Sequence, residues 1–230
     1  MQKQWGSETG RSVLDPTVPI DVGTLSQRQR IVDAMLASCA EKTYAATTIA
    51  DIVSRASISR TTFYKRFADK RECFDAAVDY CIAEVQLAAG EAHSSQDSPA
   101  VAVRKATAAI LDLLAARPDL AQLVMCEAVS VEPAIVDRYR KLLAPSLERL
   151  WSRAGEPVRS YADPGLAFGR AQVLIFNQIA GGRTKRLPDL LPEIVYLALL
   201  PFAGHDEAVR QSRLAEPTGN PEGSAPRGDG

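Results

Sequence analysis

The stretch that decides the fold spans residues 47–67 and reads TTIADIVSRASISRTTFYKRF. Its spacing predicts two short helices joined by a tight turn. Four apolar residues of the first helix recur at i, i+3, i+4 and i+7 and share one face: Ile49, Ile52, Val53 and Ala56. Thr47 or Thr48 can cap the start of this helix. Asp51 completes a capping-box-like pattern with Thr48, with Asp in place of the preferred Glu.

The turn and the second helix follow directly. Ile58 is placed to fill the angle between the two helices, and Ser59 is a good N-cap for the second one. Phe63 and Phe67 lie at i and i+4, so both face inward. The outward face is polar and consists of Arg60, Thr61, Tyr64 and Lys65, with Thr62 near its border.

This outward face suits a groove of DNA. Arg and Thr at the start of a recognition helix reach base edges, and Tyr and Lys farther along hydrogen-bond to phosphates. From Arg55 to Arg71 six basic residues stand against one acid, Asp69, a local charge of +5 on a chain of net charge −1. Charge alone would favour an amphipathic hairpin with a solvated basic face. The two caps, the turn and the basic face together favour DNA binding.

Residues 30–74 resemble the DNA-binding domain of the TetR (tetracycline-repressor-type) family of transcriptional regulators. The matching residues are Ile31, Ala34, Thr47, Thr48, Asp51, Ile52, Ala56, Ile58, Ser59, Thr62, Phe63, Tyr64, Phe67 and Lys70. Ser57 and Thr61 depart from the family, which usually has Gly at both positions. The turn at Ser57 must therefore form without the residue best suited to a left-handed conformation.

The DNA-binding residues expected from the pattern and the resemblance are Thr48, Arg60, Thr61, Thr62, Tyr64, Lys65 and Lys70. Lys70 stands at the start of another helix, where the pattern Asp69-Lys70-Arg71-Glu72 predicts a capped N-terminus. The helix dipole adds to the attraction of this lysine for a phosphate.

The composition limits the other functions. The 230 residues are 46% hydrophobic and 24% charged, which suits one compact protein of one or two domains. No apolar run reaches 18 residues, so no membrane span is expected, and the N-terminus has no signal-peptide core. The four cysteines have no CxxC spacing and predict structural thiols in a reducing cytoplasm, with a redox sensor as the alternative. Two histidines without ligand-like neighbours predict no metal site, and no cofactor is expected.

The helical pattern predicts an all-α chain in four parts: a flexible arm (1–25), the helix-turn-helix head (26–72), a helical ligand-binding and dimerisation domain (73–204) and a disordered tail (205–230). The first helix is expected at 26–42, with Ile31, Met35 and Cys39 as its core stripe. The remaining helices are expected at 70–92, 99–116, 119–129, 133–153 with a kink at Pro145, 164–180 and 188–200.

The last two predicted helices are apolar nearly all the way round, so each is buried on more than one side. Ordinary core in a monomer would explain this. The resemblance instead implies a four-helix interface between two subunits, with Val173, Phe176, Val195 and Leu199 in it. It also implies a small-molecule pocket, for which the candidates are Met125, Tyr139, Leu143, Trp151, Phe168 and Phe176; for each of these alone, plain core is the simpler explanation.

The leading hypothesis is a cytoplasmic, ligand-responsive transcriptional regulator, usually a repressor, that binds a palindromic operator as a homodimer. The alternative is an apolar small-molecule-binding helical protein whose helix-turn-helix is vestigial. An enzyme is not expected, because no nucleophile–base pair, phosphate loop or metal spacing is present in the sequence.

Overall fold

The computed structural model describes residues 22–132, 135, 141 and 164–216, and these residues form helices and no strand. The helices are α1 (Val22–Lys42), α2 (Ile49–Arg55), α3 (Arg60–Tyr64), α4 (Lys70–Glu91), α5 (Pro99–Ala116), α6 (Pro118–Gln122), the π-helical turn η1 (Leu123–Glu127), α7 (Ala128–Val131), α10 (Pro164–Ala180), the 3-10 helix η2 (Thr184–Leu190) and α11 (Leu191–Arg213). The all-α prediction is confirmed.

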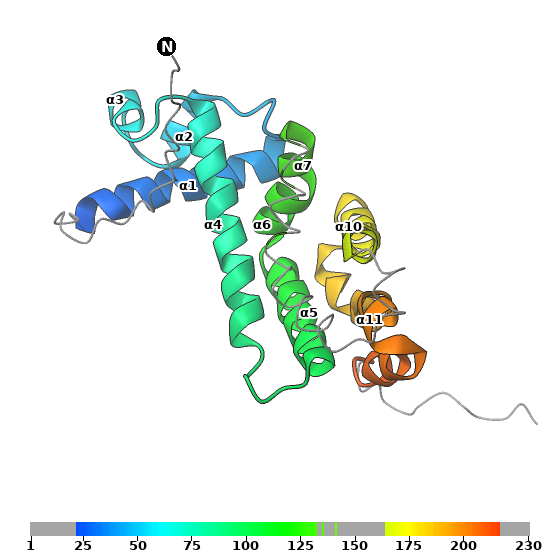
Figure 1. The fold of residues 1–230 in the computed structure, drawn as a ribbon. Coiled ribbons are helices and arrows are strands. Elements are labelled where there is room, and N and C mark those ends of the chain that lie inside the picture. Colours follow the sequence, from blue (N-terminus) through cyan, green and yellow to red (C-terminus); the bar gives the residue numbers. More distant parts are fainter. Residues whose placement is uncertain (1–21, 133–134, 136–140, 142–163, 217–230) are drawn as a thin grey trace, which may run out of the picture.

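The helices form a head and a body (Figure 1). Helices α1, α2 and α3 lie together at one end of the molecule, and the long helix α4 leads away from them into the body. Helix α5 contacts α4 on one side and η2 and α11 on the other, so it is the central helix of the body. Helix α6 and η1 lie against α1, which connects the body directly to the head.

The core of the head comes from the apolar faces that the sequence pattern predicts. Ile31, Met35 and Cys39 of α1 are buried, as is Ile52 of α2. Phe63 and Phe67 are also buried, with their ring centroids 5.8 Å apart. This core continues along α4 into α5, α6 and η1, so the head and the first half of the body share one apolar core.

A second apolar cluster joins α11 to the start of α5, through Val195, Leu199 and Phe202 of α11 and Ala100 of α5. Val195 and Leu199 are completely buried within the single chain. These two side chains, which were predicted to lie in a dimer interface, are therefore covered by their own chain, whereas Leu197 and Leu200 of the same helix are only half-buried.

The last helical region extends beyond the prediction. The last helix was expected to end at residue 200, before Pro201 and Gly204, and α11 spans Leu191–Arg213. Gly204 has non-helical backbone angles, with a φ of 79° and a ψ of 173°, so one helical segment ends there, close to the predicted end, and a second segment follows across a kink. Residues 205–213, expected in a disordered tail, pack Ala208 and Gln211 into the body. Among the described residues Thr184–Arg213 is the one helical stretch long and apolar enough to cross a membrane, a property that core helices share.

Two other regions differ from the prediction. The helix expected at 119–129 consists of three successive turns, α6, η1 and α7, of which the middle one is π-helical. The helix expected at 133–153, with its kink at Pro145, lies outside the described residues apart from residues 135 and 141. Helices α5 and α10 begin and end where the sequence predicts.

Candidate nucleic-acid interface

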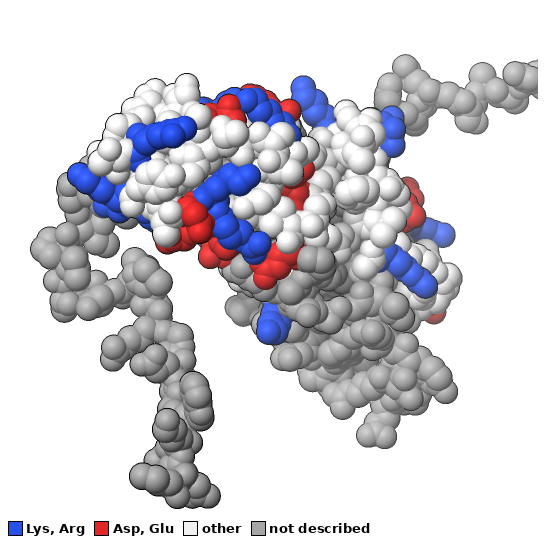
Figure 2. Space-filling model, turned by 90° about the horizontal axis from the view of Figure 1, so that it is seen from above, with Lys and Arg blue, Asp and Glu red and all other residues white. Residues whose placement is uncertain are grey.

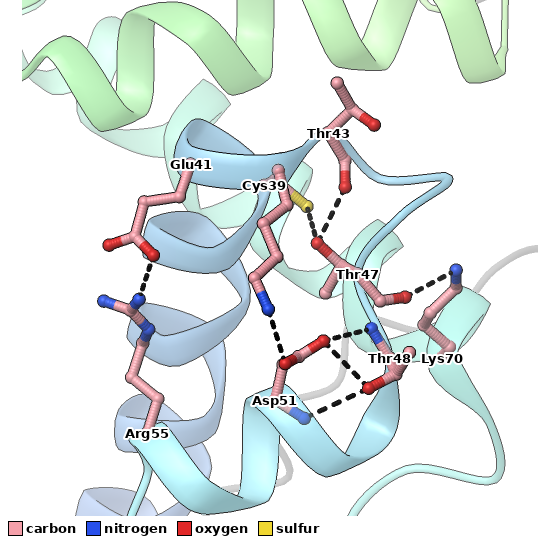
Figure 3. Close-up of polar contacts among 9 residues, drawn as sticks. Cys39, Glu41, Thr43, Thr47, Thr48, Asp51, Arg55 and Lys70 are labelled. Atoms are coloured by element: carbon pink, nitrogen blue, oxygen red, sulfur yellow. Dashed lines mark hydrogen bonds and ion pairs between the residues drawn. The ribbon is translucent and has the colours of Figure 1, made fainter.

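The first helix of the helix-turn-helix is fixed by its cap (Figure 3). The Asp51 backbone N–H donates to Thr48 Oγ1 at 3.2 Å, and the Thr48 backbone N–H donates to Asp51 Oδ2 at 2.9 Å. Lys42 Nζ donates to the same carboxylate at 2.7 Å. These bonds, with the one from Lys42 first, hold the pKa of Asp51 below its usual range. Since the Thr48 hydroxyl also donates to Asp51, a DNA contact by Thr48 would have to compete with the cap.

The turn between α2 and α3 contains one unfavourable backbone conformation. Ser57 has a φ of 53°, in the left-handed region that Gly adopts most easily. Ile58 packs against the core of the head, as predicted. Ser59 then caps α3, because the Thr62 backbone N–H donates to Ser59 Oγ at 3.1 Å. The turn therefore forms although Ser, and not Gly, occupies its left-handed position.

The outer face of α3 is exposed. Arg60, Thr61 and Lys65 are accessible to solvent, whereas the Thr62 side chain is half-buried and lies 3.0 Å from Ser59 Oγ. Tyr64 is 54% exposed. Its ring packs edge-on against the buried Phe63 at a centroid distance of 5.5 Å, which limits how the ring can turn. The helix thus presents four accessible polar side chains on one short surface.

Ion pairs neutralise much of the positive charge between Arg55 and Arg71. Arg55 pairs with Glu41, and Arg71 pairs with Asp75 and Glu132. Figure 2 looks down on this end of the molecule and shows Asp and Glu lying among the Lys and Arg side chains. Within the described part of the chain, Arg60 and Lys65 form no ion pair, so these two cations remain available for an anionic ligand.

Lys70 has a different environment from the one expected. Its Nζ donates to the backbone carbonyls of Tyr44 and Thr47, each at 2.9 Å, and lies 4.2 Å from the centroid of the Tyr44 ring. The ammonium group therefore holds the connection between α1 and α2 from within. A phosphate contact by Lys70 stays a prediction, and it would have to share the ammonium with these carbonyls.

The residues expected to line a ligand pocket are only partly described. Met125 lies half-buried in η1 and packs against the core. Tyr139, Leu143 and Trp151 lie outside the described residues, and Phe168 lies in α10. Phe176 is 43% exposed and Val173 is 58% exposed, and both lie on α10, whereas Ile175 and Ile179 of the same helix are buried. The outward side of α10 therefore carries two large exposed apolar side chains beside the exposed Arg170 and Asn177.

Sequence reasoning missed two groups that hold the head in place. Tyr44 lies in the connection between α1 and α2, and its backbone N–H donates to Glu127 Oε2 of η1 at 2.7 Å. The two residues are 83 positions apart, and no local pattern links them. Glu127 stands within an apolar segment, which is the one sequence signal that could have drawn attention to it.

The thiols have no feature of a reactive site. Burial raises the pKa of Cys39 to about 11, of Cys73 to about 12 and of Cys126 to about 11. Burial also raises the pKa of Cys81. A thiol with a raised pKa is a poor nucleophile at neutral pH, which does not favour the redox-sensor alternative. No group of His, Cys, Asp and Glu within the described ranges could hold a metal ion.

Comparison with known proteins agrees with this geometry. The family model of the bacterial regulatory proteins of the tetR family matches residues 31–77. A TetR-like transcriptional regulator from Rhodococcus sp. RHA1 has a similar structure, with a TM-score of 0.62, 20% identity, and coverage of 77% of this chain and 96% of that one. Comparison with curated protein sequences gave no significant match.

Two further structures that are similar in fold belong to a regulator and a receptor with named ligands. The regulator FadR from Bacillus subtilis, in complex with stearoyl-CoA, has a TM-score of 0.60 at 18% identity and covers 76% of this chain and 98% of its own. A gamma-butyrolactone receptor (ArpA-like protein) has a TM-score of 0.56 at 17% identity and covers 84% of this chain and 100% of its own. Residues 31–77 of this chain therefore match the amino-terminal domain of the tetR family of bacterial regulatory proteins, and the described helices share the fold of a TetR-like regulator.

Proposed function

We propose that the chain is a cytoplasmic, ligand-responsive transcriptional regulator that represses by binding a palindromic operator as a homodimer. The observation that carries this proposal is the outer face of α3. It is exposed, polar and fixed by two side-chain caps, at Thr48 and Ser59. A vestigial helix-turn-helix would not need both caps and two accessible, unpaired cations, so these features favour a working DNA reader over the carrier alternative.

In this proposal some side chains at α3 contact bases and others contact phosphates. Arg60 and Thr61 stand in the first turn of α3, where the side chains of a recognition helix reach base edges in the major groove. Tyr64 and Lys65 stand at the other end of the helix, where a hydroxyl and an ammonium group can meet phosphates. Thr48 and Lys70 then act mainly by holding the helices in place.

The homodimer is supported by α10 rather than by α11. Val173 and Phe176 leave an apolar surface on α10 that the single chain does not cover. A large exposed apolar patch rimmed by polar residues is typical of an interface. A two-fold pairing through this surface would present two copies of α3 to two half-sites of one operator.

The effector is proposed to be a mostly apolar small molecule bound by the body. Its binding would shift the population between two arrangements of the heads. The regulators of similar fold whose descriptions name stearoyl-CoA and gamma-butyrolactone make an acyl-type ligand the first class to test. Met125 in η1 is the described pocket candidate that lies nearest to the head along the chain.

The test is selection of duplexes from a random DNA library with the full-length protein, followed by affinity measurements at several salt concentrations. A palindromic consensus, and a log–log decrease of affinity with salt, would support the proposal. Arg60→Ala should cost about 1–3 kcal/mol of binding and relax the preference at one base position. Lys65→Ala and Tyr64→Phe should weaken binding to all duplexes alike, because phosphate contacts carry no base information.

Lys185→Ala is the matched control for the lysine variant, since Lys185 is exposed on η2 in the body. It should leave DNA affinity unchanged. Recovery of no consensus, together with tight uptake of an acyl ligand, would favour the carrier alternative instead.

A further inference from the structure

A buried carboxylate of the body accepts a hydrogen bond from the backbone of the head. Glu127 of η1 is only 9% exposed, and its Oε2 accepts the backbone N–H of Tyr44 at 2.7 Å. Glutamate is rarely buried without a partner that compensates for its lost hydration. Among the described residues, the hydrogen-bond partner of Glu127 is the backbone N–H of Tyr44, which restricts where the carboxylate can lie.

The Tyr44 backbone is held on its other side as well. Its carbonyl accepts from Lys70 Nζ at the start of α4, and the same ammonium group binds the Thr47 carbonyl. Thr47 is buried and donates from its hydroxyl to the Thr43 carbonyl at 2.7 Å. The connection of residues 43–48 is therefore bound by a carboxylate from η1 and by an ammonium group from α4. Figure 3 shows the bond of this ammonium group to Thr47.

This connection leads directly into α2. Thr48, the residue after Thr47, is the N-cap of α2, and α2 and the capped turn in turn place α3. A second carboxylate, that of Glu132 just after α7, pairs with Arg71 at the start of α4. Glu127 thus contacts Tyr44, and Glu132 contacts Arg71, the residue that follows Lys70.

The segment that carries Glu127 is itself irregular. η1 is a π-helical turn between two α-helical turns, and it also contains Met125. Such turns hold one extra residue and are common at functional sites. A change in the register of η1 would move Glu127 with respect to Tyr44, because both Met125 and Glu127 belong to the same turn.

We propose that Glu127 is a positioning residue for DNA binding: its carboxylate holds the Tyr44 N–H and so fixes the α2–α3 unit against the body. This inference rests on the proposed function and names the contact through which the body acts on DNA affinity. Glu127 itself does not touch DNA. Its effect passes through Tyr44, Thr47 and the cap of α2.

Three substitutions separate this role from the alternatives. Glu127→Gln keeps an oxygen that can accept from the Tyr44 N–H and removes the charge. Glu127→Asp keeps the charge but is one methylene shorter, so the contact is lost. Glu127→Leu fills a similar volume with no acceptor at all. A positioning role predicts that only the Gln variant resembles the wild type; a charge effect would favour Asp, and simple packing would favour both Gln and Leu.

The first readout is amide hydrogen exchange of the full-length protein, followed in the peptide of residues 43–48. Exchange should become about tenfold faster or more in the Asp and Leu variants and stay near the wild-type rate in the Gln variant, because the Asp and Leu variants lose the acceptor for the half-buried Tyr44 amide and the Gln variant keeps it. The peptide of residues 99–116, from α5, is the internal control and should not change. Faster exchange there as well would indicate general unfolding and a merely structural role for Glu127.

The second readout is affinity for the duplex that the wild type selects. The Asp and Leu variants should bind it about tenfold more weakly, with the Gln variant close to the wild type. If all three variants bind as the wild type does, the positioning role is wrong while the proposed function stands. If the wild type selects no duplex, the proposed function fails, and the positioning role for DNA fails with it.

Discussion

The helices of the head and those that follow α5 begin in different ways. In the head, α2, α3 and α4 each begin at a side chain that accepts a backbone N–H: Thr48, Ser59 and Asp69. In the body, α5 still begins at a Ser98 cap, whereas α6 and η2 begin without any side-chain cap bond, and η1, α7 and α11 each continue the turn before them. Local sequence therefore defines where the helices of the head start, whereas packing against neighbours defines those after α5.

The difference has a physical reason in helix length. Helix α3 has five residues and α2 has seven, and helices of that length are not stable alone in water. Each needs its cap and its buried residues together. Helix α11 has 23 residues and tolerates Pro201 and a positive φ at Gly204, because its buried side chains hold it against α5. One region thus depends on individual hydrogen bonds and the other on total buried surface.

The largest loss of stability should come from a charge introduced into the buried cluster between α11 and α5. Val195→Glu places a carboxylate at a position that is completely buried in the apolar cluster between α11 and α5. Burial without a partner should cost about 3–5 kcal/mol, so the chain should unfold or aggregate rather than form a stable monomer. Thermal unfolding followed by circular dichroism measures this. A folded monomer of undiminished stability would instead return Val195 to an interface between chains.

Val173→Glu is the matched change on the exposed side of α10, where the side chain is 58% exposed. The helical content should be retained, because the new carboxylate can remain in water. If Val173 lies between two subunits, the dimer should dissociate, since the pair of substitutions would place two carboxylates near the two-fold axis. Sedimentation measures the outcome. A variant that remains a dimer would remove α10 from the interface.

A smaller effect should come from the caps. Ser59→Ala removes the acceptor for the Thr62 N–H and should lower the free energy of unfolding by about 1 kcal/mol. Ser98→Ala removes an equivalent cap from the 18-residue α5, where Val101 N–H donates to Ser98 Oγ at 3.4 Å. The cost there should be less, because that bond is long and packing holds α5. Urea unfolding of both variants decides; equal costs would contradict the contrast between the two regions.

The smallest effect should be a gain. Ser57→Gly relieves a left-handed residue that is exposed and carries no cap. Relief of the strain, less the entropy that Gly loses on folding, should stabilise the head by about 0.5–1 kcal/mol. The melting temperature should rise slightly and DNA affinity should stay constant, because the outer face of α3 is untouched. A lower melting temperature would mean that the Ser57 side chain contributes more than its backbone strain costs.

The sequence predicts the head more accurately than the later helices, for the same reason. The caps at Thr48, Ser59 and Asp69 are local patterns, and all three are confirmed. Pro201 and Gly204 were interpreted as the end of the last helix, because locally they are helix-ending residues. Gly204 does end one helical segment. The segment after it was missed because its contacts, such as that of Gln211 with Arg104, come from α5, which a local pattern does not contain.

The candidate site divides in the same way. The outward position of Arg60, Thr61, Tyr64 and Lys65 follows from helical spacing and is confirmed. The partners of Lys70 and Glu127 could not be predicted, because they depend on how the connection between α1 and α2 folds back. An apolar helix likewise does not reveal whether its own chain or a second chain covers it, which is why the burial of Val195 and Leu199 within their own chain was not predicted.

The four cysteines give the protein a set of internal reporters. Cys39 and Cys73 lie in the core around the head, Cys81 lies farther along α4, and Cys126 lies in η1 beside Glu127. Cys39, Cys73 and Cys81 are buried, so their reaction with an alkylating reagent requires the surrounding structure to open first, whereas the half-buried Cys126 needs less opening; the raised pKa slows the reaction of all four at neutral pH. The order in which the native cysteines become labelled would therefore rank the stability of the head, the connecting helix and the π-helical turn in the unmodified chain.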